Sequence, residues 1–393
     1  MKKKLFIILT LSLFGTSEIN ACSMYKSTKN GKTIVGNNED YFSPNSQFWF
    51  EEGSATKFGV LYMGLLDNFA QGAINDAGLV FDGFFEPYLA VTDTLGKLKI
   101  PIEKALLHVM QTMQRVEEVK AYLKTIDLSV LTQSQLVFVD STGTYLIVEG
   151  DTLFVGEEPE KSFSNFYYSQ VSSIGEVDLD YFQNGQRFLE KTSGRNTLDY
   201  CAQAMKNFAQ KRIAPTQYST VYDLKTLTVR VYLFHDFSNF VEVDLKKELK
   251  KGNHRIMIAE LFPEDTIGYQ HYLKYNNLEH PSLFLEEYLG TEKISEEEFT
   301  SSGFDTIIIS LADEWLYDKS NAEGAIKVCH YGISLMPNNS KLYCKLGSAY
   351  LEKKDWNNAI KSYAKSLHLD PENSEALDKL TKAANNRQEK ESN

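Results

Sequence analysis

The period of the hydrophobic positions divides the chain into two parts. Over residues 22–265, short apolar runs rich in β-branched and aromatic residues alternate with turn signals, which is the pattern of strands joined by hairpins. From about residue 306 the apolar positions recur every three or four residues, as in amphipathic helices. We therefore predict an α+β domain over 22–265 and a small all-α module over 306–387, with 266–305 as a connector and 388–393 as a frayed tail.

Two turn signals in the first part predict hairpins. Asp140-Ser-Thr-Gly143 separates apolar runs at 135–139 and 145–149, and Asp223-Leu-Lys-Thr226 separates runs at 220–222 and 227–234. Apolar residues at three- and four-residue spacing predict amphipathic helices over 102–123 and 198–208. Further strand candidates are 33–36, 59–65 and 78–81.

The C-terminal part resembles the tetratricopeptide repeat, a helix pair of about 34 residues. Residues 340–373 carry its small, aromatic and proline positions, among them Ala359 and Pro371. One repeat length upstream, these two positions become Ala325 and Pro337, which predicts a second repeat over 306–339. Small residues let the paired helices approach, and the proline ends the second helix. Residues 374–387 are then expected to cover the apolar face of the last repeat.

Composition narrows the classes of function. The chain is 42% hydrophobic and 12% aromatic, enough for a packed core, so it is not mainly disordered. Its formal net charge of −12 argues against nucleic-acid binding, which needs a basic face. The histidines are scattered and no Cys-x-x-Cys pair occurs, so we expect neither a metal site nor a cofactor.

The N-terminus carries a processing signal. A basic start with three lysines precedes a short apolar run, and Ala21 offers a small residue before a cut, as in a secretory signal peptide. We therefore expect residues 1–21 to be removed and the protein to be exported to the periplasm or outside the cell. A cut after Ala21 would make Cys22 the first residue.

Three alternatives stay open for Cys22. As an N-terminal residue it would carry a thiol and a free α-amine whose reference pKa is near 7.7–8.0, so the amine could act as the base that activates the thiol. The run Ile19-Asn20-Ala21-Cys22 also resembles a lipobox loosely, and lipidation of the sulfur would anchor the protein at the cell envelope. In the third alternative the cut lies elsewhere and Cys22 is an ordinary cysteine.

Residues downstream resemble the cysteine N-terminal nucleophile (Ntn) hydrolases. The group comprises choloylglycine hydrolase, penicillin V acylase and the acyl-coenzyme A:6-aminopenicillanate acyltransferase-like peptidases. The resemblance covers residues 22–240 in chain order. Its motifs are Cys22-Ser-Met-Tyr, Gly36-Asn-Asn-Glu-Asp40, Asn75-Asp-Ala-Gly78-Leu79, the hairpin 137–149, Ser164-Asn165-Phe166, Gln186-Arg187-Phe188 and the hairpin 220–232.

The resemblance implies a four-layer αββα sandwich and assigns roles to four residues. Cys22 would be the nucleophile, with its α-amine as the base, and Asp40 would hold the amine or thiol. Asn165 would donate to the oxyanion, and Arg187 would stabilise the thiolate. The alternatives are purely structural: Asp40 would cap a turn, Asn165 would be an ordinary loop residue, and Arg187 would lie on the surface of a helix.

Two departures from the family pattern concern the substrate. Asn37 stands where the bile-salt and penicillin acylases carry arginine, and Phe85 stands where a second oxyanion asparagine is expected. Phe84, Phe85 and Tyr88 could line an apolar acyl pocket or belong to the core.

The resemblance therefore implies hydrolysis of a linear, non-peptide amide of an N-acyl small molecule through a thioester. There are three alternatives. The protein could transfer the acyl group to an amine, or it could be a lipid-anchored protein with a non-catalytic hydrolase fold. It could also be an interaction protein that binds a protein partner through its repeats. Contact with a membrane is expected only if Cys22 is lipidated.

Overall fold

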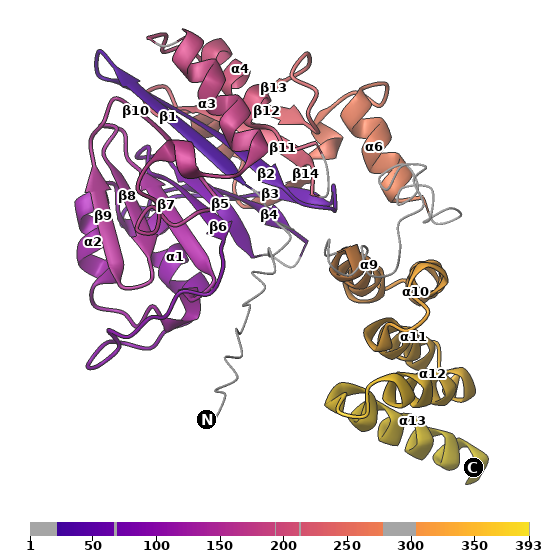
Figure 1. Cartoon of the computed structure of the whole chain (residues 1–393). Coiled ribbons are helices and arrows are strands. Elements are labelled where there is room, and N and C mark those ends of the chain that lie inside the picture. The colour runs from indigo at the N-terminus through magenta and orange to yellow at the C-terminus, as the bar shows by residue number, and fades with distance from the viewer. Residues whose placement is uncertain (1–21, 67–68, 193, 212–213, 278–303, 393) are drawn as a thin grey trace, which may run out of the picture.

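The computed structural model describes residues 22–66, 69–192, 194–211, 214–277 and 304–392 (Figure 1). The signal peptide predicted for 1–21 and most of the connector predicted for 266–305 lie outside these residues. No helix in the described ranges has the length and hydropathy needed to cross a bilayer.

Two antiparallel sheets form the centre of the first domain. The six-stranded sheet has the order β10 (Glu160–Ser164), β1 (Ser23–Lys29), β2 (Lys32–Asp40), β11 (Thr216–Asp223), β12 (Thr228–Leu233) and β13 (Val241–Asp244). The eight-stranded sheet has the order β14 (His254–Met257), β3 (Ser46–Glu51), β4 (Val60–Leu65), β5 (Ala70–Asn75), β6 (Val80–Phe85), β7 (Ser134–Val139), β8 (Tyr145–Glu149) and β9 (Thr152–Gly156). Both predicted hairpins are present, as β7–β8 and β11–β12.

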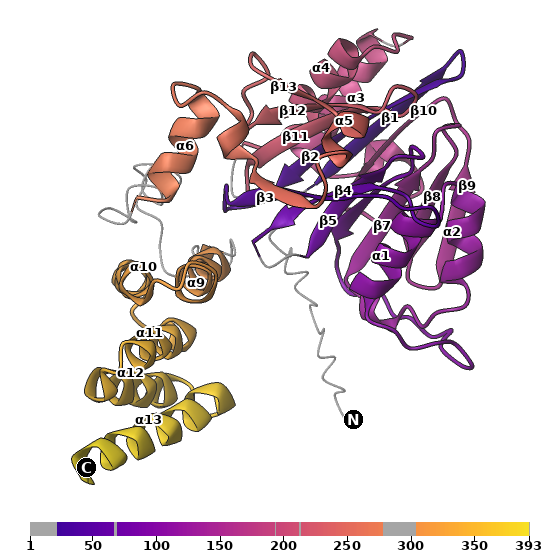
Figure 2. The same ribbon diagram turned by 180° about the vertical axis from the view of Figure 1, so that it is seen from behind.

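Helices cover the outer face of each sheet, so the predicted four-layer αββα order is confirmed. Helices α1 (Ile102–Thr112) and α2 (Val116–Leu123) pack on the eight-stranded sheet, and α3 (Asp180–Thr192) and α4 (Leu198–Phe208) pack on the six-stranded sheet (Figures 1 and 2). A third apolar cluster, with Met24 and Val35 on one side and Phe48 and Ile74 on the other, fills the space between the sheets. The shorter elements are η1 (Ser129–Leu131), η2 (Ile174–Glu176), α5 (Leu245–Leu249), η3 (Ala259–Leu261) and α6 (Ile267–Tyr275).

The single helix predicted for 102–123 is wrong, because the chain breaks there into α1 and α2. The side-chain amide of Asn75 donates hydrogen bonds to the backbone carbonyls of Met110 and Met113 at 2.9 and 2.8 Å. The carboxylate of Asp140 accepts the backbone N–H of Val116 at 3.2 Å. These side chains satisfy backbone groups that a continuous helix would have paired internally, and apolar periodicity alone does not reveal them.

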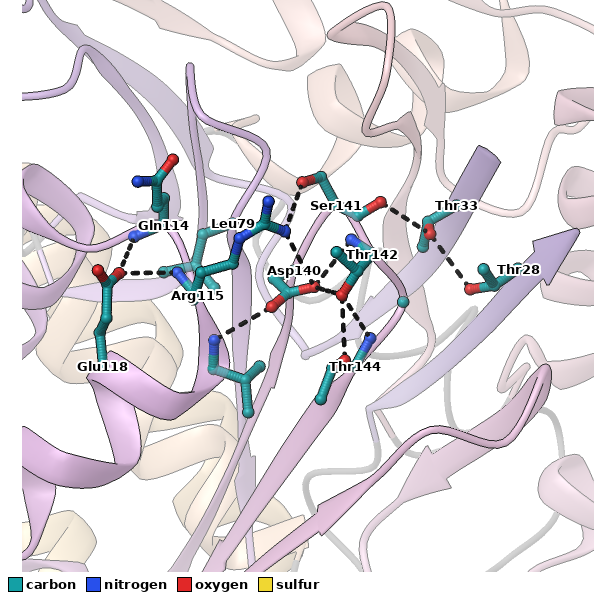
Figure 3. Close-up of polar contacts among 12 residues, drawn as sticks. Thr28, Thr33, Leu79, Gln114, Arg115, Glu118, Asp140, Ser141, Thr142 and Thr144 are labelled. Atoms are coloured by element: carbon teal, nitrogen blue, oxygen red, sulfur yellow. Dashed lines mark hydrogen bonds and ion pairs between the residues drawn. The ribbon is translucent and has the colours of Figure 1, made fainter. Parts of the chain in front are cut away.

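The turn between β7 and β8 ties the two sheets together. Asp140 also accepts the backbone N–H of Thr142 at 2.8 Å and faces Arg115 at 3.8 Å. The carbonyl of Ser141 accepts the hydroxyl of Thr33 at 3.2 Å from the β1–β2 hairpin (Figure 3). The turn of the eight-stranded sheet is thereby fixed to β2, the strand that pairs with β1 after Cys22.

The C-terminal module contains the predicted helix pairs. These are α9 (Phe304–Asp313) with the π-helical turn η4 (Glu314–Asp318), α10 (Ala322–Leu335), α11 (Ser340–Glu352) and α12 (Trp356–Leu369), followed by α13 (Ser374–Ser392). Gly347 of α11 lies against the ring of Tyr363 of α12, where an added Cβ would come within 2.7 Å. Helix α13 continues to Ser392 and so includes residues of the predicted tail.

The helical module contacts the first domain through its first helices. In both views α9 lies nearest to the domain and α13 lies farthest from it (Figures 1 and 2). Phe42, which follows β2, and Tyr275 of α6 belong to the same apolar cluster as Trp315. Buried Glu314 accepts hydrogen bonds from Asn45 and, at 2.8 Å, from the Tyr275 hydroxyl. The contact is therefore both apolar and specifically hydrogen-bonded.

Candidate active site

Cys22 lies between the two sheets at the start of β1. Ser23 pairs with Asn38, which places Cys22 beside the end of β2. Its side chain is 6% exposed, and Sγ lies 3.6 Å from Oε2 of Glu39. The Cys22 carbonyl accepts the hydroxyl of Ser164 at 2.7 Å. The nucleophile candidate is thus fixed by both neighbouring strands of its sheet.

Three buried carboxyl groups surround this thiol. Glu39 and Asp40 end β2, while Asp82 reaches the same place from β6 in the opposite sheet. Asn37 donates to Oε1 of Glu39 at 2.9 Å, and Thr216 donates to Oδ1 of Asp40 at 2.5 Å. Asp40 is 1% exposed, and its Oδ2 has no hydrogen-bond partner among the described residues.

Burial governs the protonation of these three carboxyl groups. Desolvation raises the pKa of Asp40 and of Asp82 well above their ordinary values, and the charge of Glu39 adds to the rise at both. Desolvation also raises the pKa of Glu39, against hydrogen bonds with Asp82, Asn37 and Cys22. Because ionised carboxylates repel each other in a buried site, Glu39 and Asp82 favour a state in which one of them is protonated.

The same environment raises the pKa of the Cys22 thiol well above its ordinary value. Burial is the main cause, and the charges of Glu39, Asp82 and Asp40 follow, while a hydrogen bond from the Asp40 backbone N–H acts in the opposite direction. A thiolate at this position therefore needs a nearby cation. The described side chains that shift the Cys22 pKa through their charge are all acidic, so the cation must come from elsewhere.

An apolar cavity of about 350 Å³ opens at Cys22. This size lies in the range of about 300–1,000 Å³ typical of small-molecule sites. Asp40, Tyr41 and Leu65 line it together with Cys22. Most of the remaining wall is apolar and consists of Phe69, Phe81, Phe84, Phe85, Ile102, Leu106, Val130, Leu131 and Leu136. The arrangement suits a substrate with an apolar acyl group.

Of the three predicted pocket residues, Phe84 and Phe85 line the cavity and Tyr88 does not. Phe84 is 1% exposed and Phe85 is 51% exposed, and both line the cavity, Phe84 in its wall and Phe85 at its rim. Tyr88 is 69% exposed and is not part of the lining. The difference in exposure between Phe84 and Phe85 follows from their neighbouring positions on β6, because successive side chains of a strand point to opposite faces of the sheet.

Asn165 and Arg187 lie in different places relative to Cys22. Asn165 follows β10, and its amide donates to the carbonyl of the rim residue Phe85 at 2.7 Å. Arg187 lies on the exposed side of α3, in the outer layer, where its guanidinium donates to Asn184 at 2.5 Å. The described contacts bring Asp40 to the thiol and Asn165 to the cavity rim, but they give Arg187 no contact with Cys22.

Glu39 and Asp82 are the site residues that sequence reasoning missed. Both stand inside strands, and Asp82 interrupts the apolar run Val80-Phe-Asp-Gly-Phe84. Because acidic side chains are seldom fully buried without a partner, a carboxylate in such a run is a signal of a polar site. No cluster of three or more histidine, cysteine or acidic side chains within the described ranges has an arrangement suited to a metal ion.

Comparison with known proteins finds one family model and several solved structures to which parts of this chain are similar. Residues 340–373 match the tetratricopeptide repeat model. A mutant conjugated bile acid hydrolase from Clostridium perfringens is 20% identical, with 60% of this chain and 96% of that chain covered and a TM-score of 0.46. Penicillin V acylase from Agrobacterium tumefaciens is 14% identical, with 60% and 90% covered and a TM-score of 0.46.

The first tetratricopeptide repeat domain of the human RPAP3 protein is 22% identical, with 25% of this chain and 80% of that domain covered and a TM-score of 0.22. A comparison with curated proteins finds no match. The repeat predicted for 340–373 is thus confirmed by its family model, and the structure shows a helix pair over 306–339 as well.

Proposed function

We propose that the protein is an exported cysteine amidase that hydrolyses linear N-acyl amides after Cys22 becomes its first residue. The observation that carries this proposal is the position of Cys22 in the lining of an apolar cavity, beside the carboxyl groups of Glu39, Asp40 and Asp82. The α-amine of a first-residue Cys22 would supply the cation that this acidic site lacks. It is also a base on the same residue that could take the thiol proton.

The reaction follows from these groups. The α-amine takes the thiol proton, and sulfur attacks the amide carbonyl to give a tetrahedral oxyanion. The ammonium then returns the proton to the leaving nitrogen, the C–N bond breaks and a thioester remains. Water, deprotonated by the same amine, hydrolyses the thioester and regenerates Cys22. No cofactor enters this scheme.

Asp40 and Asn165 have supporting roles in the proposal. The unpartnered oxygen of Asp40 would accept from the α-ammonium and keep it beside the sulfur. The Asn165 amide carries two N–H donors, and only one is needed for its bond to Phe85. The other could stabilise the oxyanion, a contribution of about 3–4 kcal/mol when preorganised.

Burial of the sulfur supports a free thiol over a lipid anchor. Cys22 is 6% exposed and belongs to the apolar cluster between the sheets. A diacylglyceryl group on this sulfur would have to fill the cavity or displace β1. The export proposal itself rests on the sequence of residues 1–21.

The test combines the mass of the mature protein with turnover of N-acyl amides that differ in acyl length. We expect an unmodified Cys22 at the N-terminus, a thioester adduct during turnover, and loss of activity in Cys22→Ala without unfolding. Cys344→Ala, at another buried cysteine in the helical module, is the matched control and should stay active. Full activity of Cys22→Ala, or acyl chains on the native sulfur, would refute the proposal.

Acyl transfer and partner binding remain as second candidates. The same thioester could pass its acyl group to an amine, and product analysis with added amines separates transfer from hydrolysis. The repeat at 340–373 belongs to a helical type that commonly forms interaction surfaces, so a protein partner is proposed for the module as well.

A further inference from the structure

A second cavity lies where the first domain meets the helical module. Its volume is about 250 Å³. Tyr41 and Leu65 line both this cavity and the one at Cys22. The junction cavity therefore adjoins the cavity at Cys22 at these two residues. Its wall combines residues at the ends of β2 and β4 with Ser310, Asp313, Glu314, Tyr317 and Asp318 of the module.

The order of the two cavities matches the two halves of an amide. The acyl group and the amine lie on opposite sides of the C–N bond that breaks. An acyl chain in the apolar cavity would leave the amine to extend past Tyr41 and Leu65. On this path the substrate would enter the junction cavity, so the helical module would contact the leaving group.

The charged residues that line the junction cavity are all acidic: Asp313, Glu314 and Asp318. They occupy the end of α9 and the turn η4, and π-helical turns are rare and frequently occur at functional sites. Glu314 already accepts from Asn45 and Tyr275 and pairs with Lys319 at 3.3 Å. It therefore holds the module on the domain.

Asp313 has unused acceptor capacity in this cavity. One of its oxygens pairs with Lys345 at 2.9 Å, while its Oδ1 is buried and has no hydrogen-bond partner among the described residues. A buried acceptor without a donor is unfavourable, and a ligand with N–H donors would satisfy it.

We propose that the junction cavity binds the amine half of the substrate and that this half carries a positive charge, as in an N-acyl diamine. The proposal rests on the amidase function above and adds the class of the leaving group. It makes the helical module a wall of the active site, with Asp313 and Asp318 as the residues that select a cationic amine.

The test uses three dodecanoyl amides that share one acyl chain and differ at the far end of the amine. N-dodecanoyl-putrescine is cationic, N-dodecanoyl-pentylamine is neutral, and N-dodecanoyl-5-aminopentanoate is anionic. We expect kcat/KM to fall in that order, by about tenfold or more from first to last, as for one charge pair worth about 1.4 kcal/mol. The preference should shrink at high salt.

The double variant Asp313→Asn with Asp318→Asn should lose this preference, so that the ratio of kcat/KM for the putrescine amide to kcat/KM for the pentylamide falls towards one. Asp93→Asn with Asp178→Asn changes the net charge equally at two exposed sites outside the cavity lining and should behave as the native chain. Melting curves show whether each variant is folded.

Equal hydrolysis of the three amides, or an unchanged preference in the Asp313/Asp318 double variant, would overturn the proposal and leave the amidase function intact. An absence of turnover together with an absence of a Cys22 thioester would overturn both.

Discussion

Replacing Asn75 with alanine is expected to destabilise the first domain and its cavity together. Asn75 ends β5 and is 0% exposed. Its amide donates to the carbonyls of Met110 and Met113 at 2.9 and 2.8 Å, and its Oδ1 accepts the backbone N–H groups of Ala77 and Leu79 at 3.2 and 2.9 Å. One side chain thus closes the β5–β6 turn and fixes the end of α1.

The magnitude follows from these four hydrogen bonds. A typical bond contributes about 1 kcal/mol net, and leaving a buried partner unsatisfied costs about 1–3 kcal/mol. Water can reach part of the opened turn, so we expect Asn75→Ala to lower the free energy of unfolding by about 3–5 kcal/mol. Because α1 supplies Ile102 and Leu106 to the cavity wall, KM for long-chain amides should rise in the same variant.

Urea unfolding followed by far-UV circular dichroism measures this loss, in the Cys22→Ala background to avoid thiol chemistry. Asn239→Ala removes an exposed asparagine that bonds Asp236 at 2.9 Å, and it should change the free energy by no more than about 0.5 kcal/mol. A loss below about 1 kcal/mol for Asn75→Ala would show that the turn and α1 do not depend on this side chain.

Three further substitutions test other parts of the structure. Gly347→Ala would place a Cβ 2.7 Å from the ring of Tyr363, so urea unfolding should show a loss of about 1–3 kcal/mol; an unchanged midpoint would contradict the helix packing. Burial raises the folded-state pKa of Asp82, so the folded chain binds more protons than the unfolded one and loses stability as pH rises from about 4. The melting temperature of Asp82→Asn minus that of the native chain should therefore increase from pH 5 to pH 8. A difference that stays constant over this range would contradict the reasoning. Phe85→Ala at the cavity rim should raise KM for dodecanoyl amides several-fold, whereas exposed Tyr88→Ala should not; equal effects would remove Phe85 from the site.

Elements with a strong local pattern could be predicted from the sequence. The helix over 198–208 and the hairpins at 135–149 and 220–234 have apolar periodicity and turn residues that agree. The motif Asn75 to Leu79 also has a local physical basis. Gly78 adopts φ +83° in the turn, and an added Cβ would lie 2.8 Å from the Leu224 carbonyl, so glycine is needed there.

Contacts between distant segments could not be predicted in the same way. The break between α1 and α2 depends on Asn75 and Asp140, whose partners lie 24–38 positions away in the chain. Strand β2 is predicted only over 33–36 because its end is polar, yet it continues to Asp40 because those side chains face a buried site. Arg187 stands in a family-like motif, but its place on α3 decides its exposure.

The polar end of β2 also links the chemistry to the processing of the chain. Glu39, Asp40 and Asp82 together make a buried site that opposes any further negative charge, including a thiolate at Cys22. Such a site is unfavourable for catalysis by a cysteine within a continuous chain, because an amide nitrogen carries no positive charge. A free α-ammonium reverses the sign of the effect, since it is attracted by the same carboxylates and stabilises the thiolate beside it. Under the proposed function, the acidic residues would therefore make the reactivity of Cys22 depend on the cut that exposes its amine.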